Sequence, residues 1–184
     1  MTHTRLQATP KRMVFISLTT AITCIFAPLS IPIPVSPVPI TLTNLVLFIS
    51  IFVLGWKDSL ISYTVYLLIG FAGLPVFSGF TGGIGKLVGP TGGYLIGFFF
   101  LILIEGLFIQ YFPYKKSSAF IGMALGMAAT YLFGTMWLAI QMNITFIAAL
   151  SVGVLPYLLG DAVKIAAALV LAPMLQSRLM NISR

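Results

Sequence analysis

Long hydrophobic stretches, separated only by short polar segments, run from about residue 13 to residue 177 of this chain. Only 7% of the residues are charged, whereas soluble domains carry about 25%. A soluble domain of this size could not bury so much apolar surface, so the sequence predicts an integral membrane protein. A cleaved signal peptide would give one such stretch at the N-terminus, but these stretches continue to the C-terminus.

The hydrophobic pattern predicts an all-α fold of six transmembrane helices within a single membrane domain, residues 1–184. The expected spans are about 13–29, 40–55, 59–72, 94–112, 118–140 and 156–177. A full crossing requires about 20 apolar residues, and the second and third spans fall short of it. If the polar turn 55–58 lies at one surface, their far ends stop inside the bilayer. The loops at those ends, 30–39 and 75–93, would then dip into the membrane and form a cavity.

Lysine and arginine residues predict the orientation, because they are enriched on the cytoplasmic side of a membrane. Six spans put both termini on one side. The basic residues on that side are Arg5, Lys11, Arg12, Lys57, Lys115, Lys116, Arg178 and Arg184. Outside the spans, the opposite side carries only Lys86, so we expect cytoplasmic termini and outward-facing loops at 30–39, 75–93 and 141–155. The basic residues form no patch, which argues against a nucleic-acid partner.

Two charged residues and a tyrosine share one face of the last span. Tyr157, Asp161 and Lys164 follow the i, i+4, i+7 spacing of a single helix face. A charge inside a membrane is costly and therefore indicates function. The alternative is an internal ion pair that serves stability alone. Glu105 lies near the middle of the fourth span with no evident partner, and we leave it out of the predicted site.

The stretch PVFSGFTGGIGKLVGPTGGY, residues 75–94, contains seven glycines and one lysine. It does not fit the phosphate-binding Gly-x-x-x-x-Gly-Lys-[Ser/Thr] motif, since Leu87 follows Lys86 and Phe80 stands where the first glycine is needed. The single histidine, His3, precludes a metal cluster built from several histidines and a Ser-His-Asp triad within the membrane. We therefore expect no enzyme activity, no metal and no cofactor, and glycines that let the backbone approach a ligand closely.

Three segments resemble the BioY family, the biotin-specific S-components (substrate-binding subunits) of energy-coupling factor transporters. They are PVPITL, GLPVFSGFTGGIGKLVGPTGGYLIGF and PYLLGDAVKIAAA. The resemblance implies a six-helix subunit of the bacterial cytoplasmic membrane that captures biotin from outside. It also implies assembly with a transmembrane coupling subunit and two cytoplasmic ATPases. The coupling subunit would contact the small residues Ser17 and Ala21 of the first helix.

Biotin has a urea-like head with two N–H donors and one acceptor, an apolar bicycle and an anionic tail. A site for it requires an acceptor, donors, a cation and aromatic walls. We assign Asp161 as the acceptor. Lys164 is the counter-charge for the carboxylate or for Asp161, and Lys86 is the alternative partner of the carboxylate. The expected walls are Phe77, Tyr94 and Tyr157, and further hydrogen bonds are expected from Thr43, Asn44, Gly82, Gly83, Thr91, Gly92 and Gly93.

Three other functions stay open at this point. An S-component for another vitamin would share the fold, and a solitary biotin carrier would work without an ATPase module. A membrane assembly protein would bind no small ligand, and its Asp161–Lys164 pair would serve stability only.

Overall fold

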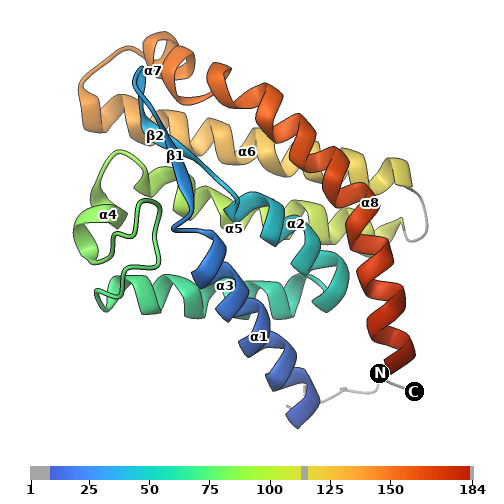
Figure 1. Ribbon diagram of the computed structural model, residues 1–184. Helices are drawn as coiled ribbons and strands as arrows, with labels where there is room; N and C mark the ends of the chain where they lie inside the picture. Colours follow the sequence, from blue (N-terminus) through green and yellow to red (C-terminus); the bar gives the residue numbers. More distant parts are fainter. Residues whose placement is uncertain (1–8, 113–115, 183–184) are drawn as a thin grey trace, which may run out of the picture.

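The computed structural model describes residues 9–112 and 116–182 and is mostly helical. Its helices are α1 (Pro10–Phe26), α2 (Thr43–Leu54), α3 (Trp56–Phe71), α4 (Ile84–Val88), α5 (Gly92–Tyr111), α6 (Lys116–Met142), α7 (Phe146–Gly153) and α8 (Leu158–Ile182), and a 3-10 turn η1 (Leu155–Tyr157) precedes α8. Two strands, β1 (Ser30–Ile33) and β2 (Ser36–Thr41), form an antiparallel hairpin. The hairpin, α4 and α7 lie at one end of the bundle, and the first residues of α1 and the last of α8 lie at the other (Figure 1).

Each of the six expected spans corresponds to a helix, with shifted ends. The second span was expected from residue 40, whereas Ile40 and Thr41 belong to β2 and α2 begins at Thr43. Proline lacks the N–H that a helix interior needs, and β-branched residues favour strands. The run SPVPIT is therefore extended. The hairpin is the exception to the all-α prediction.

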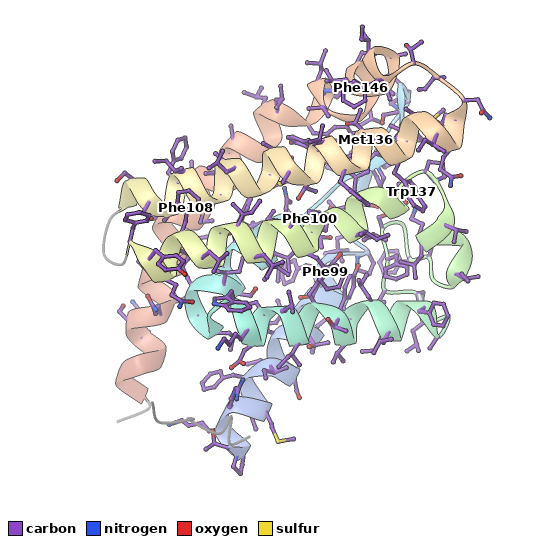
Figure 2. All side chains as sticks on the ribbon, turned by 180° about the vertical axis from the view of Figure 1, so that it is seen from behind. Phe99, Phe100, Phe108, Met136, Trp137 and Phe146 are labelled. Atoms are coloured by element: carbon purple, nitrogen blue, oxygen red, sulfur yellow. The ribbon has the colours of Figure 1, made fainter. Side chains whose placement is uncertain are left out.

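Three stretches of the described residues are long and apolar enough to cross a membrane: Gly92–Tyr111, Ser117–Met142 and Phe146–Arg178. The helices α1, α2 and α3 have 17, 12 and 16 residues and are shorter than a full crossing. Apolar side chains cover the outer face of the bundle, and Phe100, Met136 and Phe146 are among those labelled in Figure 2. This surface belongs in hydrocarbon, and the protein is a multi-pass membrane protein.

Helices α5 and α6 form the most extensive contact in the bundle, and small residues make it possible. A Cβ atom at Gly126 would press on the backbone of Leu101, and one at Gly134 would overlap the ring of Tyr94. Thr130 Oγ1 donates a 3.0 Å hydrogen bond to the carbonyl of Gly97. Such spacing lets helix backbones approach closely in lipid. Helices α5 and α6 together therefore form a rigid support for side chains that point toward α2 and α8.

The end of the bundle opposite the hairpin carries an ion pair between α1 and α3. The Nε atom of Arg12 donates hydrogen bonds to the two carboxylate oxygens of Asp58 at 2.8 and 2.9 Å. At the same end, a single residue, Gly55, turns the chain from α2 into α3 with a φ of 79°. His3 and several residues used for the orientation lie outside the part of the chain that the structure describes. Arg5, Lys115 and Arg184 lie outside the described residues, as does the side chain of Lys116.

Candidate functional site

A pocket lies where the hairpin meets the helices. Its walls come from β2, α2, α3, α5, α6, α7 and the start of α8. The lining residues are Val38, Pro39, Thr41, Thr43, Asn44, Tyr66, Ser78, Thr91, Tyr94, Leu95, Phe98, Met127, Thr130, Tyr131, Gly153, Tyr157, Asp161 and Lys164. Seven of these were expected from the sequence: Thr43, Asn44, Thr91, Tyr94, Tyr157, Asp161 and Lys164. Aromatic walls with a few polar groups are typical of small-molecule pockets.

Asp161 is the polar centre of this pocket and is only 7% exposed. Its Oδ1 accepts hydrogen bonds from Asn44 Nδ2 at 2.8 Å and from Lys164 Nζ at 2.7 Å. The hydroxyl of Tyr131 donates to Oδ2. An ionised carboxylate offers about four acceptor positions. With three partners in place, Asp161 keeps one position on Oδ2 for a donor from a ligand.

The four polar groups reach this point from three helices. Asp161 lies in the first turn of α8, where the helix dipole favours a negative charge. Lys164 follows one turn later on the same face, as the i, i+3 spacing predicted. Asn44 is the second residue of α2, and Tyr131 is on α6 next to Thr130, which packs on α5. The ion pair therefore does not stand alone, and each carboxylate oxygen has a partner from another helix.

The hairpin forms the outer wall of the pocket and is tied to the helices by one side chain. The hydroxyl of Tyr157 donates to the carbonyl of Val38 on β2. The hydroxyl of Tyr94 on α5 donates a 3.0 Å hydrogen bond to the carbonyl of Gly153 on α7. Both tyrosines were expected as aromatic walls, and each also fixes a neighbouring segment of backbone.

The glycine-rich segment contributes less to the lining than expected. Phe77 is fully buried and packs edge-on against Tyr66, with ring centroids 5.5 Å apart. It therefore stands behind the wall rather than in it. Gly82, Gly83, Gly92 and Gly93 lie outside the lining as well.

Gly82 and Gly93 allow close packing, whereas Gly83 adopts a φ of 86° with open space beside it. A Cβ at Gly82 would overlap the carbonyl of Leu74, and one at Gly93 would overlap Trp137. Trp137 in turn donates to the carbonyl of Gly89 at 2.9 Å (Figure 2). Lys86, on α4, also lies outside the lining, and partial burial lowers the pKa of its ammonium group.

Several lining residues had no signal in the sequence. Tyr66, Phe98 and Met127 are apolar or aromatic residues within apolar helices, and nothing in their spacing separates a pocket wall from a core contact. Tyr131 belongs to the same class, although it contacts Asp161 directly. The i, i+4 register of α6 could have placed it beside Met127, but not beside α8.

Ser17 and Ala21 lie far from this pocket, on the exposed face of α1. They line a shallow groove between α1 and α3, together with Thr20, Cys24 and Val65 among others. Both helices also contribute to the ion pair between Arg12 and Asp58. The small side chains leave the backbone of α1 accessible along this groove.

Glu105 is 0% exposed, and within the described part of the chain neither carboxyl oxygen has a hydrogen-bond partner. It does not line the pocket. Among the described residues, no group of three or more histidine, cysteine, aspartate or glutamate side chains could hold a metal ion.

Comparison with known proteins gives one consistent result. A family model described as the BioY family matches residues 1–181. A probable biotin transporter BioY of Pyrococcus horikoshii is 38% identical over 168 residues, covering 90% of this chain and 96% of that protein. A biotin transporter BioY of Thermotoga maritima is 39% identical over 145 residues, covering 77% of this chain and 83% of that protein. The fold matches a crystal structure of the S-component for biotin from an ECF-type ABC transporter, with a TM-score of 0.84, 30% identity and 91% of both chains covered.

Proposed function

This chain belongs to the BioY family, and from that membership we propose that it is the biotin-binding S-component of an energy-coupling factor transporter. The observation that carries the proposal is a pocket centred on Asp161, in a fold that matches a solved biotin S-component over 91% of both chains. The subunit captures biotin from outside and releases it inside with an ATP-driven coupling module. It is a transport subunit rather than an enzyme, and it needs no cofactor.

The proposed topology has six membrane crossings with both termini in the cytoplasm. The distribution of basic residues supports it, because Arg12 and Lys57 lie at the end of the bundle away from the hairpin. The hairpin, the glycine-rich segment and α7 then face outward. In this orientation the pocket opens toward the side from which biotin arrives.

In the proposed site, Asp161 accepts a hydrogen bond from a ureido N–H of biotin. Support comes from the acceptor position that Oδ2 retains after Tyr131 has donated to it. Lys164 neutralises Asp161 at 2.7 Å and is the cation within the pocket that a carboxylate could also approach. Lys86 is the alternative at the outer end. Thr43 and Thr91 supply hydroxyl groups, and Tyr94 and Tyr157 cover the bicycle.

The proposed partners are a transmembrane coupling subunit and two cytoplasmic ATPases. The groove beside Ser17 and Ala21 is the proposed contact with the coupling subunit, because its small residues let another helix approach the backbone. A solitary carrier remains the second candidate, and uptake of biotin by cells expressing this chain without a coupling module would favour it.

The test is biotin binding by the purified chain, measured by titration calorimetry, with Asp161→Asn as the variant. A hydrogen bond to a charged group contributes about 1.5–3 kcal/mol, so loss of the Asp161 carboxylate should weaken binding by roughly 10- to 100-fold. Asp58→Asn is the matched control, since Asp58 pairs with Arg12 outside the pocket. Equal affinity of wild type and Asp161→Asn would refute the role of Asp161. If wild type binds a different vitamin more tightly than it binds biotin in a competition measurement, the substrate assignment is wrong.

A further inference from the structure

A second groove lies on the outer surface between α6 and α8. Its α6 side is formed mainly by Phe120, Ala124 and Ala128, and its α8 side mainly by Leu158, Ala162 and Ala166. Helix α6 packs closely on α5 but meets α8 over a much shorter length. Alanine rows on both helices leave an apolar furrow where the helices diverge.

The furrow and the ligand pocket share one wall. Met127, Tyr131 and Asp161 line both of them. Oδ1 of Asp161 accepts from Asn44 and Lys164, which line the pocket and not the furrow. Oδ2 accepts from the hydroxyl of Tyr131. A single side-chain layer, with a hydrogen bond across the seam between α6 and α8, therefore separates the pocket from the surface.

The furrow is continuous with the surface that faces lipid. Exposed apolar residues flank it, namely Leu125 and Leu132 on α6 and Val163 and Val170 on α8. Both helices belong to stretches long enough to cross a membrane. The medium in contact with this surface is hydrocarbon, and Asp161 is the one charged residue among those that line the furrow. We propose that an acyl chain of a bilayer phospholipid binds in the furrow, and that Tyr131 is the partition that keeps this chain out of the ligand pocket.

Tyr131 suits this role because it separates two incompatible environments. A carboxylate that faces hydrocarbon is costly. The hydroxyl of Tyr131 occupies one position on Oδ2 of Asp161, and its ring presents an apolar surface to the furrow. Without the ring, the furrow and the pocket merge, and an acyl chain competes with the ligand for the same space.

Native mass spectrometry of the chain in mild detergent tests the lipid site directly. Wild type retains a phospholipid, and Ala128→Trp, which fills the furrow, lowers that retention by about tenfold. Met136→Trp, on the same helix but outside the furrow (Figure 2), retains lipid as wild type does. The proposal is overturned if wild type retains no phospholipid, or if Ala128→Trp retains as much as wild type. It is also overturned if wild type carries a bound protein in place of phospholipid and Ala128→Trp lacks that protein, since the occupant of the furrow would then be a helix.

The partition is tested by measuring biotin affinity while phospholipid is added to the detergent solution, a measurement that rests on the proposed function. Wild type and Tyr131→Phe, which keeps the ring, bind biotin with affinities independent of lipid. Tyr131→Ala loses affinity as lipid increases, by about tenfold at saturation. If the affinity of Tyr131→Ala is lowered equally at every lipid concentration, the partition is wrong. The lipid count in the first experiment does not depend on biotin, so failure of one proposal is distinguishable from failure of the other.

Discussion

Asn44 Nδ2 donates a 2.8 Å hydrogen bond to Oδ1 of Asp161, which lies 117 residues later in the chain. The bond joins the first turn of α2 to the first turn of α8, and both residues are buried. The acidic centre of the pocket is thus held from a second helix as well as by its own neighbour Lys164.

Replacement of Asn44 by alanine should weaken biotin binding by roughly 10- to 100-fold, because a hydrogen bond to a charged group contributes about 1.5–3 kcal/mol. Titration calorimetry on the purified chain measures this change. Asn143→Gly is the control, since Asn143 is exposed in the loop before α7 and has a φ of 52° that glycine tolerates. Unchanged affinity of Asn44→Ala would mean that Lys164 and Tyr131 alone position Asp161.

Replacement of Lys164 by alanine should weaken biotin binding much more than replacement of Lys86 by alanine. Lys164 lies 2.7 Å from Asp161 inside the pocket, so Lys164→Ala removes the cation that holds this carboxylate and should weaken binding by roughly 10- to 100-fold. Lys86 is half-buried on α4 and lies outside the lining, so Lys86→Ala removes no contact within the pocket and should change affinity by less than about threefold. A larger loss for Lys86→Ala than for Lys164→Ala would assign the biotin carboxylate to the outer end.

The hydroxyl of Tyr157 fixes the hairpin, and Tyr157→Phe should release it while keeping the ring in the wall. We expect faster amide exchange across residues 30–41, measured by mass spectrometry, and dissociation of biotin about fivefold faster, as for the loss of about 1 kcal/mol. Tyr111→Phe serves as control because Tyr111 is 71% exposed at the end of α5. Exchange that stays at the wild-type rate would show that strand pairing alone holds the hairpin.

Ala21→Trp should fill the groove between α1 and α3 and reduce recovery of the coupling subunit in affinity purification by at least about tenfold. Biotin binding by the isolated chain should stay at the wild-type level, because Ala21 does not line the ligand pocket. Ile22→Trp, on the same helix but outside the groove, should assemble normally. Normal assembly of Ala21→Trp would exclude this groove as the docking face.

The sequence predicted the helices well because long apolar stretches have few alternatives in a membrane. It also predicted a functional role for Asp161 and Lys164, since a charged residue within a membrane span is energetically costly and therefore indicates function. Each of these predictions rests on a local pattern with a strong energetic cause.

Non-local contacts explain what the sequence did not predict. The pairing of β1 with β2 requires two proline-rich segments to meet, and proline, which lacks the amide donor of a strand, argued against a hairpin at this place. Phe77 was expected in the pocket wall, but the structure packs it behind Tyr66. Tyr131 was not expected, since a tyrosine in an apolar helix carries no energetic cost that marks it. In both cases the deciding fact is which neighbouring helix the ring faces.

The composition of the hairpin also bears on the association of this protein with other chains in the membrane. A sheet of two strands leaves both outer edges unpaired, and unpaired edges invite strands from other chains. Here Pro32, Pro34, Pro37 and Pro39 withhold four amide donors within and between the two strands. The prolines of the hairpin, which forms the outer wall of the pocket, therefore also protect the protein from self-association through its outer surface.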